Sequence, residues 1–345
     1  MKLGFVGLPG AGKTTIFNAV TGSEAQGYAE VNLASVPVPD MRLEKLAAMF
    51  NPKKVTTATV NFADIAGLVK GSGLGNRVLA HVREADAVLM VLQCFEKDCD
   101  PMGDRETVDL ELCMADIEVV EKRIARVEKA AKGDRSLLRE AELFKALKAH
   151  LDKGFSARAF VCSDEDKNLI ADCPLLTNKP VLYCANLSEE NFKTRDTFKP
   201  YLDLAKAAEE EGAMVFPICA ELEQEIMQME PDDRAVFLED LGMDQPGRDR
   251  LIQVSYDLMG LMSFLTAGAP EVRAWTIKKG TKAPVAAGKI HKDLQRGFIR
   301  AEVIGFDTLM ECGSMAAAKE KGLLRVEGKE YVMRDGDVVH FLFNV

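Results

Sequence analysis

The sequence of 345 residues lacks the features that mark several large classes of protein. Its eight cysteines are scattered, with no Cys-x-x-Cys pair and no cysteine–histidine cluster at zinc-ligand spacing, so we expect reduced, structural thiols. No apolar run approaches the roughly 18 residues that a membrane-spanning helix needs. Residues 1–6 lead directly into a strand pattern, so we expect no cleaved signal. These absences favour a folded cytoplasmic protein that does not bind a membrane.

Positive charge is also outweighed by negative charge, and the net charge is −10. Such a balance argues against a protein that coats nucleic acid with its whole surface. Two segments depart from it: residues 119–153 carry 10 Lys/Arg against 6 Asp/Glu, and residues 271–345 carry 13 against 10. The first segment is either a solvated helix face or a local contact for nucleic acid, and both interpretations stay open.

The order of short β-rich runs and helical patterns predicts an α/β fold with a mostly parallel sheet. We expect buried strands over residues 2–6, 59–62, 87–92, 180–184 and 214–218. Asp40 is expected to cap a helix that stops near Asn51. Helical periodicity from Asp116 to Leu151, broken at Gly133, predicts an inserted helical hairpin of coiled-coil type. The predicted domains are an α/β core domain (1–115 and 155–268), the hairpin (116–154) and a small mixed β domain (269–345).

Residues 7–14 match the phosphate-binding pattern G-x-x-x-x-G-K-[ST], between a predicted strand and a predicted helix. Glycines let backbone N–H groups approach a polyphosphate closely, and the helix adds its positive N-terminal end. Lys13 is expected to act on the outer phosphates as a catalytic group, and Thr14 to bind Mg²⁺ through its hydroxyl. The segment predicts these nucleotide-binding residues: Gly7, Leu8, Pro9, Gly10, Ala11, Gly12, Lys13, Thr14 and Thr15.

Residues 64–67 form an Asp-x-x-Gly pattern at the end of a predicted strand. Asp64 is expected to hold Mg²⁺ through water, and the Gly67 N–H to meet the γ-phosphate as a second catalytic group. Leu68 follows, where many GTPases carry a glutamine that orients the attacking water. His81 is a further catalytic candidate, although a solvated helix histidine is the alternative.

A base-reading loop is expected after the strand that ends near residue 184. Guanine-specific proteins have Asn-Lys-x-Asp there, whereas this chain has Asn186, Leu187, Ser188 and Glu189. The lysine is absent and glutamate replaces the aspartate, so strict choice of guanine is not encoded. Asn186, Leu187 and Glu189 are therefore predicted to bind the base of ATP or GTP, with Cys219 and Ala220 behind it; a plain turn is the alternative.

With these motifs in order, the chain resembles the YchF family of Obg-like ATPases. The resemblance implies a G domain, an inserted hairpin and a C-terminal TGS domain of β-grasp type. It further implies ATP binding, with GTP taken by some members, and association with the ribosome or ribosomal RNA. The segments that carry it are residues 36–40, 64–71, 73–76, 186–189, 271–276, 286–291, 297–303 and 335–341.

The chain departs from the family where hydrolysis takes place. Gly10 stands where the family has an asparagine that in related GTPases can bind potassium, and Tyr28 aligns with a threonine that binds magnesium. Segments 21–35 and 71–75 are shorter than expected. We therefore predict a slow, monomeric nucleotide switch, with a binding module that hardly hydrolyses its nucleotide as the alternative and a small-molecule kinase as a remote third.

Overall fold

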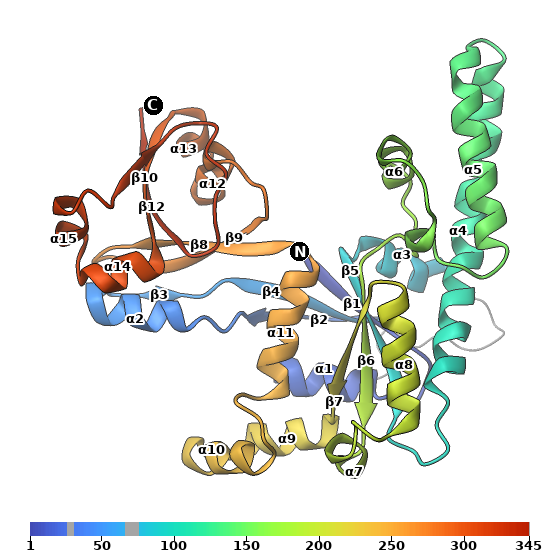
Figure 1. Cartoon of the computed structure of the whole chain (residues 1–345), viewed down its shortest axis with the longest axis horizontal. Coiled ribbons are helices and arrows are strands. Elements are labelled where there is room, and N and C mark those ends of the chain that lie inside the picture. The colour runs from blue at the N-terminus through green and yellow to red at the C-terminus, as the bar shows by residue number, and fades with distance from the viewer. Residues whose placement is uncertain (26–30, 66–75, 345) are drawn as a thin grey trace. The chain divides into compact units, whose positions relative to one another are not determined.

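The computed structural model of the chain describes residues 1–25, 31–65 and 76–344 (Figure 1). The chain divides into two compact units, Met1–Ala34 with Asn61–Leu251 and Ser35–Val60 with Ile252–Val345. This division differs from the boundaries expected from the sequence, since residues 35–60 and 252–268 join the C-terminal unit. The two units are defined by compactness. The predicted boundaries of the domains therefore stay a prediction.

A six-stranded sheet forms the centre of the first unit, in the order β2-β4-β1-β5-β6-β7. The pairings of β1 with β4 and β5, of β5 with β6 and of β6 with β7 are parallel. All five predicted strands are confirmed, and three of them extend further than predicted. The strands are β1 (Lys2–Val6), β2 (Val31–Pro37), β4 (Thr59–Ile65), β5 (Ala87–Cys94), β6 (Val181–Leu187) and β7 (Met214–Ile218).

Helices cover both faces of this sheet because alternate strand residues point to opposite sides. Phe5 of β1 packs edge-on against Phe17 of α1 (Lys13–Thr21). The next residue, Val6, belongs to the hydrophobic cluster on the other face, to which several further helices contribute side chains. Among them are α3 (Asn76–Glu84), α4 (Pro101–Ala131) and α8 (Lys199–Glu210). The unit also contains α6 (Asp164–Ala171), α7 (Glu189–Lys193), α9 (Ala220–Gln228) and α10 (Pro231–Asp240), with the short turns η1 (Arg135–Leu137) and η2 (Ala157–Ala159).

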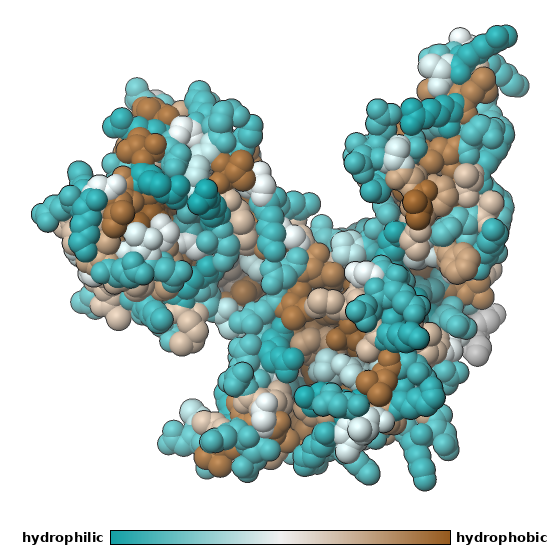
Figure 2. Space-filling model, viewed as in Figure 1, coloured by the Kyte–Doolittle hydropathy of each residue, from teal (hydrophilic) through white to brown (hydrophobic). Residues whose placement is uncertain are grey.

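The predicted helical hairpin is formed by α4 and α5 (Leu138–Leu151), which lie side by side in Figure 1. Val120 and Phe144 are fully buried in the cluster between them. Figure 2 shows mainly hydrophilic side chains over the visible hairpin surface. One difference from expectation is that α4 begins at Pro101 rather than near Asp116. Asp100 caps the helix by accepting from the Gly103 N–H, and proline suits its first turn.

The second unit contains its own six-stranded sheet, in the order β11-β10-β12-β8-β9-β3. Its strands are β3 (Val55–Thr56), β8 (Leu261–Ala267), β9 (Val272–Lys278), β10 (Phe298–Gly305), β11 (Arg325–Glu327) and β12 (Asp337–Phe343). The sheet is mixed, as predicted: β8–β9 and β10–β12 are antiparallel, whereas β12–β8 is parallel. Its helices are α2 (Met41–Phe50), α12 (Ala283–Ile290), α13 (Lys292–Arg296), α14 (Phe306–Cys312) and α15 (Met315–Glu320), and α11 (Gly247–Leu258) crosses from one unit to the other.

Several local predictions about α2 and the cysteines are confirmed. Asp40 caps α2 by accepting from the Arg42 N–H, and the helix ends at Asn51 in the left-handed conformation. All eight cysteines are free thiols. No helix in the described ranges has both the length and the apolar character that crossing a membrane requires.

Candidate nucleotide-binding site

The predicted phosphate-binding loop lies between the end of β1 and the start of α1. Gly7 and Gly12 have φ angles of 153° and 87°. A Cβ atom at Gly7 would lie 2.3 Å from the Val91 carbonyl oxygen, and one at Gly12 would lie 2.2 Å from Asn186 Nδ2. Both positions therefore require glycine. Gly12 also offers no side chain to the first N–H groups of α1, which leaves them free to bind an anion.

Lys13 is buried, with 7% of its surface exposed. Its Nζ donates to the carbonyl oxygens of Gly7 and Leu8, at 3.0 and 2.8 Å, so the side chain folds back over the loop. Burial lowers the pKa of Lys13 to about 8, and the Asp64 carboxylate opposes that shift. Phosphate oxygens can replace these two carbonyls as acceptors while adding a full negative charge.

Thr14 and Asp64, the two predicted magnesium ligands, lie together. The Thr14 hydroxyl donates to Asp64 Oδ2 at 2.8 Å. Asp64 is almost fully buried near the end of β4, where it is in register with Phe5 of β1. A hydroxyl and a carboxylate are oxygen ligands of the kind that Mg²⁺ takes beside nucleotide phosphates, so these residues fit the ion. Asn32 of β2 also donates to Asp64 Oδ2, at 3.2 Å.

A pocket of about 330 Å³ lies beside the phosphate-binding loop. Asn186 joins the loop to the pocket: its Nδ2 donates to the Ala11 carbonyl at 3.1 Å, and its Oδ1 accepts from the Ala220 N–H at 3.3 Å. The volume lies near the lower end of ligand pockets, roughly 300–1,000 Å³, which suits a nucleoside. Its lining residues are Gly10, Gly12, Thr15, Phe95, Asn186, Leu187, Ser188, Ala220 and Glu221.

Two predicted base-binding residues lie outside that lining. Glu189 forms an ion pair with Lys193 at 2.6 Å on the exposed side of α7, and its neighbour Ser188 caps that helix. Cys219 is buried directly before α9, where burial raises the pKa of its thiol. Leu8, Pro9 and Ala11 belong to the phosphate-binding loop but do not line the pocket.

Of the remaining catalytic candidates the structure describes His81 alone, and no hydrogen bond or ion pair joins it to the described residues of the site. His81 lies in the last turn of α3, with Nδ1 at 3.9 Å from Glu84 Oε2. Gly67, Leu68 and Tyr28 lie outside the described residues, so their predicted roles stay predictions.

Four residues of the site had no binding role predicted from the sequence, namely Asn32, Phe95, Ser188 and Glu221. Ser188 nevertheless lies in the loop that was expected to read the base, and Glu221 directly follows Ala220. Phe95 directly follows β5, at the carboxyl edge of a parallel sheet where ligands commonly bind. That rule, applied to every predicted strand, would have identified it. Asn32 carries no comparable signal, because its place depends on β2 lying next to β4.

Two family models match the chain. One, described as "50S ribosome-binding GTPase", matches residues 2–130. The other, YchF-GTPase_C, described as "Protein of unknown function (DUF933)", matches residues 261–344. The two matches agree with the order of a G domain followed by a C-terminal domain.

Full-length relatives are similar over the whole chain. The "Ribosome-binding ATPase YchF" of Bacillus subtilis is 45% identical over 364 residues, which cover 100% of both chains. The "Obg-like ATPase 1" of Oryza sativa is 38% identical over 100% of this chain and 92% of its own. The structure of the Schizosaccharomyces pombe YchF GTPase superposes with a TM-score of 0.88 at 30% identity, covering 99% of this chain and 97% of that one.

Proposed function

The chain belongs to the YchF family of Obg-like ATPases, and from that premise we propose that it is a slow, nucleotide-dependent switch that hydrolyses ATP on the ribosome. GTP binds too, without preference over ATP. The observation that carries this proposal is the bridge made by Asn186 between the phosphate-binding loop and a nucleoside-sized pocket. One side chain thereby links the place of the base to the place of the phosphates.

In this function the chain's own residues mainly bind and orient the triphosphate. The N–H groups at the start of α1 hold phosphate oxygens, and Lys13 turns from the Gly7 and Leu8 carbonyls to the outer phosphates. Thr14 and Asp64, which lie together, would hold Mg²⁺, and the ion would supply positive charge to offset that of the phosphates. Gly67 and His81 remain the candidates for groups that approach the γ-phosphate.

The choice of base follows from what reaches the pocket. Guanine recognition needs a carboxylate facing the base, whereas Glu189 pairs with Lys193 outside the lining. Leu187 and Ser188 line the pocket without a charge, and the carboxylate in the lining is that of Glu221, in the first turn of α9 and not in the loop of residues 186–189. These contacts support ATP binding at least as strong as GTP binding.

The ribosome as partner is supported by the names of the full-length relatives and of the matching G-domain model. A cytoplasmic monomer fits that partner. Occupation of the γ-phosphate position would change the affinity for the ribosome, as it does in switches whose segments are ordered by the nucleotide.

Co-sedimentation with ribosomes tests the switch. The wild-type chain should pellet to different extents with a non-hydrolysable ATP analogue and with ADP. Lys13→Ala, which cannot bind the outer phosphates, should remove that difference, whereas replacement of the exposed Lys45 by alanine should preserve it. Equal pelleting of the wild type in both nucleotide states would contradict the proposal.

A second function is favoured by Gly10, which lines the pocket without offering a side-chain ligand. In that alternative the chain holds its nucleotide as a regulatory module and hardly hydrolyses it. The two functions share every binding contact described above and differ only in turnover.

A further inference from the structure

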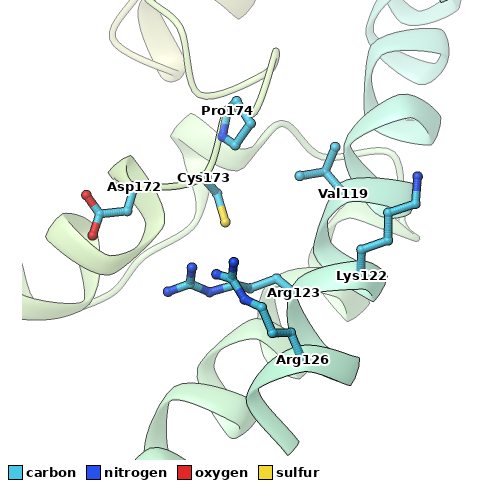
Figure 3. Close-up of a pocket in the computed structure, with 7 residues that line it drawn as sticks. All are labelled: Val119, Lys122, Arg123, Arg126, Asp172, Cys173 and Pro174. Atoms are coloured by element: carbon cyan, nitrogen blue, oxygen red, sulfur yellow. The ribbon is translucent and has the colours of Figure 1, made fainter. Parts of the chain in front are cut away.

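The pockets formed by the described residues differ in the charge of their linings. One of about 300 Å³ lies between α4 and residues 172–174, and Figure 3 shows Arg123 and Arg126 extending from α4 below the sulfur of Cys173. The pocket beside the phosphate-binding loop has the opposite character, because Glu221 is the one charged side chain among the described residues of its lining. A carboxylate repels the phosphates of a nucleotide, so it must face a different part of the ligand.

The Glu221 carboxylate is available to a ligand. The residue is exposed, and its side chain forms no hydrogen bond or ion pair with any described residue. Two other glutamates are engaged: Glu189 pairs with Lys193 at 2.6 Å, and Glu223 accepts from two N–H groups at the start of α11, both at 2.9 Å. Of these three glutamates, Glu221 alone lines the pocket and keeps both carboxylate oxygens available as acceptors.

Glu221 lies at the end of the pocket that suits a base. Asn186 Nδ2 donates to the Ala11 carbonyl in the phosphate-binding loop, and Asn186 Oδ1 accepts from the Ala220 N–H. The Asn186 side chain thereby spans the distance from the loop to the first residue of α9, and Glu221 follows in the first turn of that helix. Phosphates belong on the loop side of Asn186, so the carboxylate lies on the side of the base.

A carboxylate is an acceptor only, and the two purines differ in what they present to it. Adenine has an amino group at C6, whose N–H groups can donate to Glu221, whereas guanine has an oxygen there. Guanine could instead donate from N1 and from its 2-amino group, but its O6 would then need a donor beside the carboxylate. The neighbouring Ala220 N–H is already bonded to Asn186, so this end of the pocket favours adenine.

We propose that Glu221 is the residue that selects the base, by accepting a hydrogen bond from the 6-amino group of adenine. Phe95 and Leu187 of the same lining provide apolar contacts to the ring of either purine. GTP therefore still binds, without the contact to Glu221. This inference rests on the proposed binding of ATP and adds to it the residue that sets the preference for adenine.

The test compares two diphosphates that differ in the amino group alone. ADP carries it, whereas purine riboside 5′-diphosphate has hydrogen in its place, with the same ribose and the same charge. Diphosphates have no γ-phosphate to lose, so calorimetry measures their binding to the full chain without turnover. Glu221→Ala removes the proposed acceptor. Glu225→Ala is the matched control, because it removes an exposed carboxylate from the same helix about 6 Å farther along its axis, outside the described lining.

The wild-type chain should bind ADP about tenfold more tightly than purine riboside diphosphate, the effect expected for one hydrogen bond to a charged acceptor. In Glu221→Ala that ratio should fall to near one, and in Glu225→Ala it should stay at the wild-type value. The loss of a negative charge does not by itself change the ratio, because both ligands carry the same charge. An unchanged ratio in Glu221→Ala, or the same fall in both variants, would overturn the assignment.

Two further ligands distinguish other roles of the carboxylate. If Glu221→Ala weakens the binding of GDP and leaves that of ADP unchanged, the carboxylate binds N1 and the 2-amino group of guanine, and the proposal is wrong. If ADP and purine riboside diphosphate weaken equally while 2′-deoxy-ADP does not, Glu221 holds the ribose, which also contradicts it. A wild-type chain that binds none of these nucleotides would contradict the proposed function itself, so the two failures can be told apart.

Discussion

At the level of single residues, Lys13 connects nucleotide binding to pH. In the free protein its pKa is about 8 because the ammonium group is buried, and the charges of bound phosphates raise that pKa. Below pH 8 the group is charged both before and after binding. Above pH 8 binding must take up a proton, so the affinity for ATP should fall by up to about tenfold per pH unit.

Calorimetry of ATP binding between pH 7.5 and 9.5, with magnesium removed by a chelator, checks this expectation. Repeating the titration in buffers of different ionisation enthalpy gives the number of protons taken up. Proton uptake should rise toward one per bound nucleotide above pH 8. Above pH 8 the ATP phosphates are almost fully ionised, so they contribute little to the proton uptake measured there. Binding that is independent of pH would show that Lys13 does not meet the phosphates.

Gly10 is the second residue with a direct prediction. It has a φ of 84°, and a Cβ atom there would have no described atom within 4 Å. Asparagine tolerates this left-handed conformation better than other side chains do. Exchange of potassium for sodium should change the wild-type hydrolysis rate by less than about twofold, under about 0.4 kcal/mol in the barrier.

Gly10→Asn should introduce a dependence on potassium, because it supplies the ligand that the family usually carries at this position. Gly10→Ala has the same backbone strain without the ligand and serves as the control. A strong potassium effect in the wild type, or the same effect in both variants, would refute the role assigned to Gly10.

At the level of elements, the ends of β1, β6 and β7 are held together by Asn186. Asn186→Ala would leave the Ala11 carbonyl and the Ala220 N–H without this partner, a cost of about 1–3 kcal/mol. Affinity for ATP should fall by about tenfold, since each 1.4 kcal/mol is a factor of ten.

Glu189→Ala is the matched variant, because it lies three residues away and outside the pocket lining. It should leave both ATP affinity and the ratio of ATP to GTP affinity unchanged in competition binding. A loss of ATP affinity equal to that of Asn186→Ala would place Glu189 at the base after all.

Elements with strong local signals were predictable from the sequence. The strands β1 and β7 have the predicted bounds because they are short apolar runs between clear turns, and α2 was predicted from the Asp40 cap. The start of α4 was missed although Asp100 and Pro101 are a recognisable cap and first turn. The strand β3 could not be predicted, because its two residues are defined by pairing with the distant β9.

The residues of the site also differ in how far they could be predicted from the sequence. The phosphate-binding loop and Asp64 follow from spacing, since their chemistry is carried by neighbouring residues in the sequence. Asn32 and Phe95 join the site only because separate strands lie next to each other. Glu189 was predicted to bind the base, but it lies outside the pocket lining and pairs with Lys193, which depends on how α7 begins.

At the level of the whole molecule, the chain is acidic and carries a preformed pocket beside its phosphate-binding loop. The central claim is that it turns over ATP as a switch on the ribosome. The same pocket and loop would also suit a module that holds ATP without hydrolysing it, so turnover is what separates the two functions.

Steady-state release of phosphate from ATP, with and without ribosomes, tests that claim most directly. The wild-type chain should release phosphate slowly by itself and faster with ribosomes, and Lys13→Ala should abolish both rates because it removes the ammonium group that we propose for the outer phosphates. Release by the wild type that never exceeds that of Lys13→Ala, with ribosomes present and ATP bound, would contradict the account and leave the non-hydrolysing module in its place.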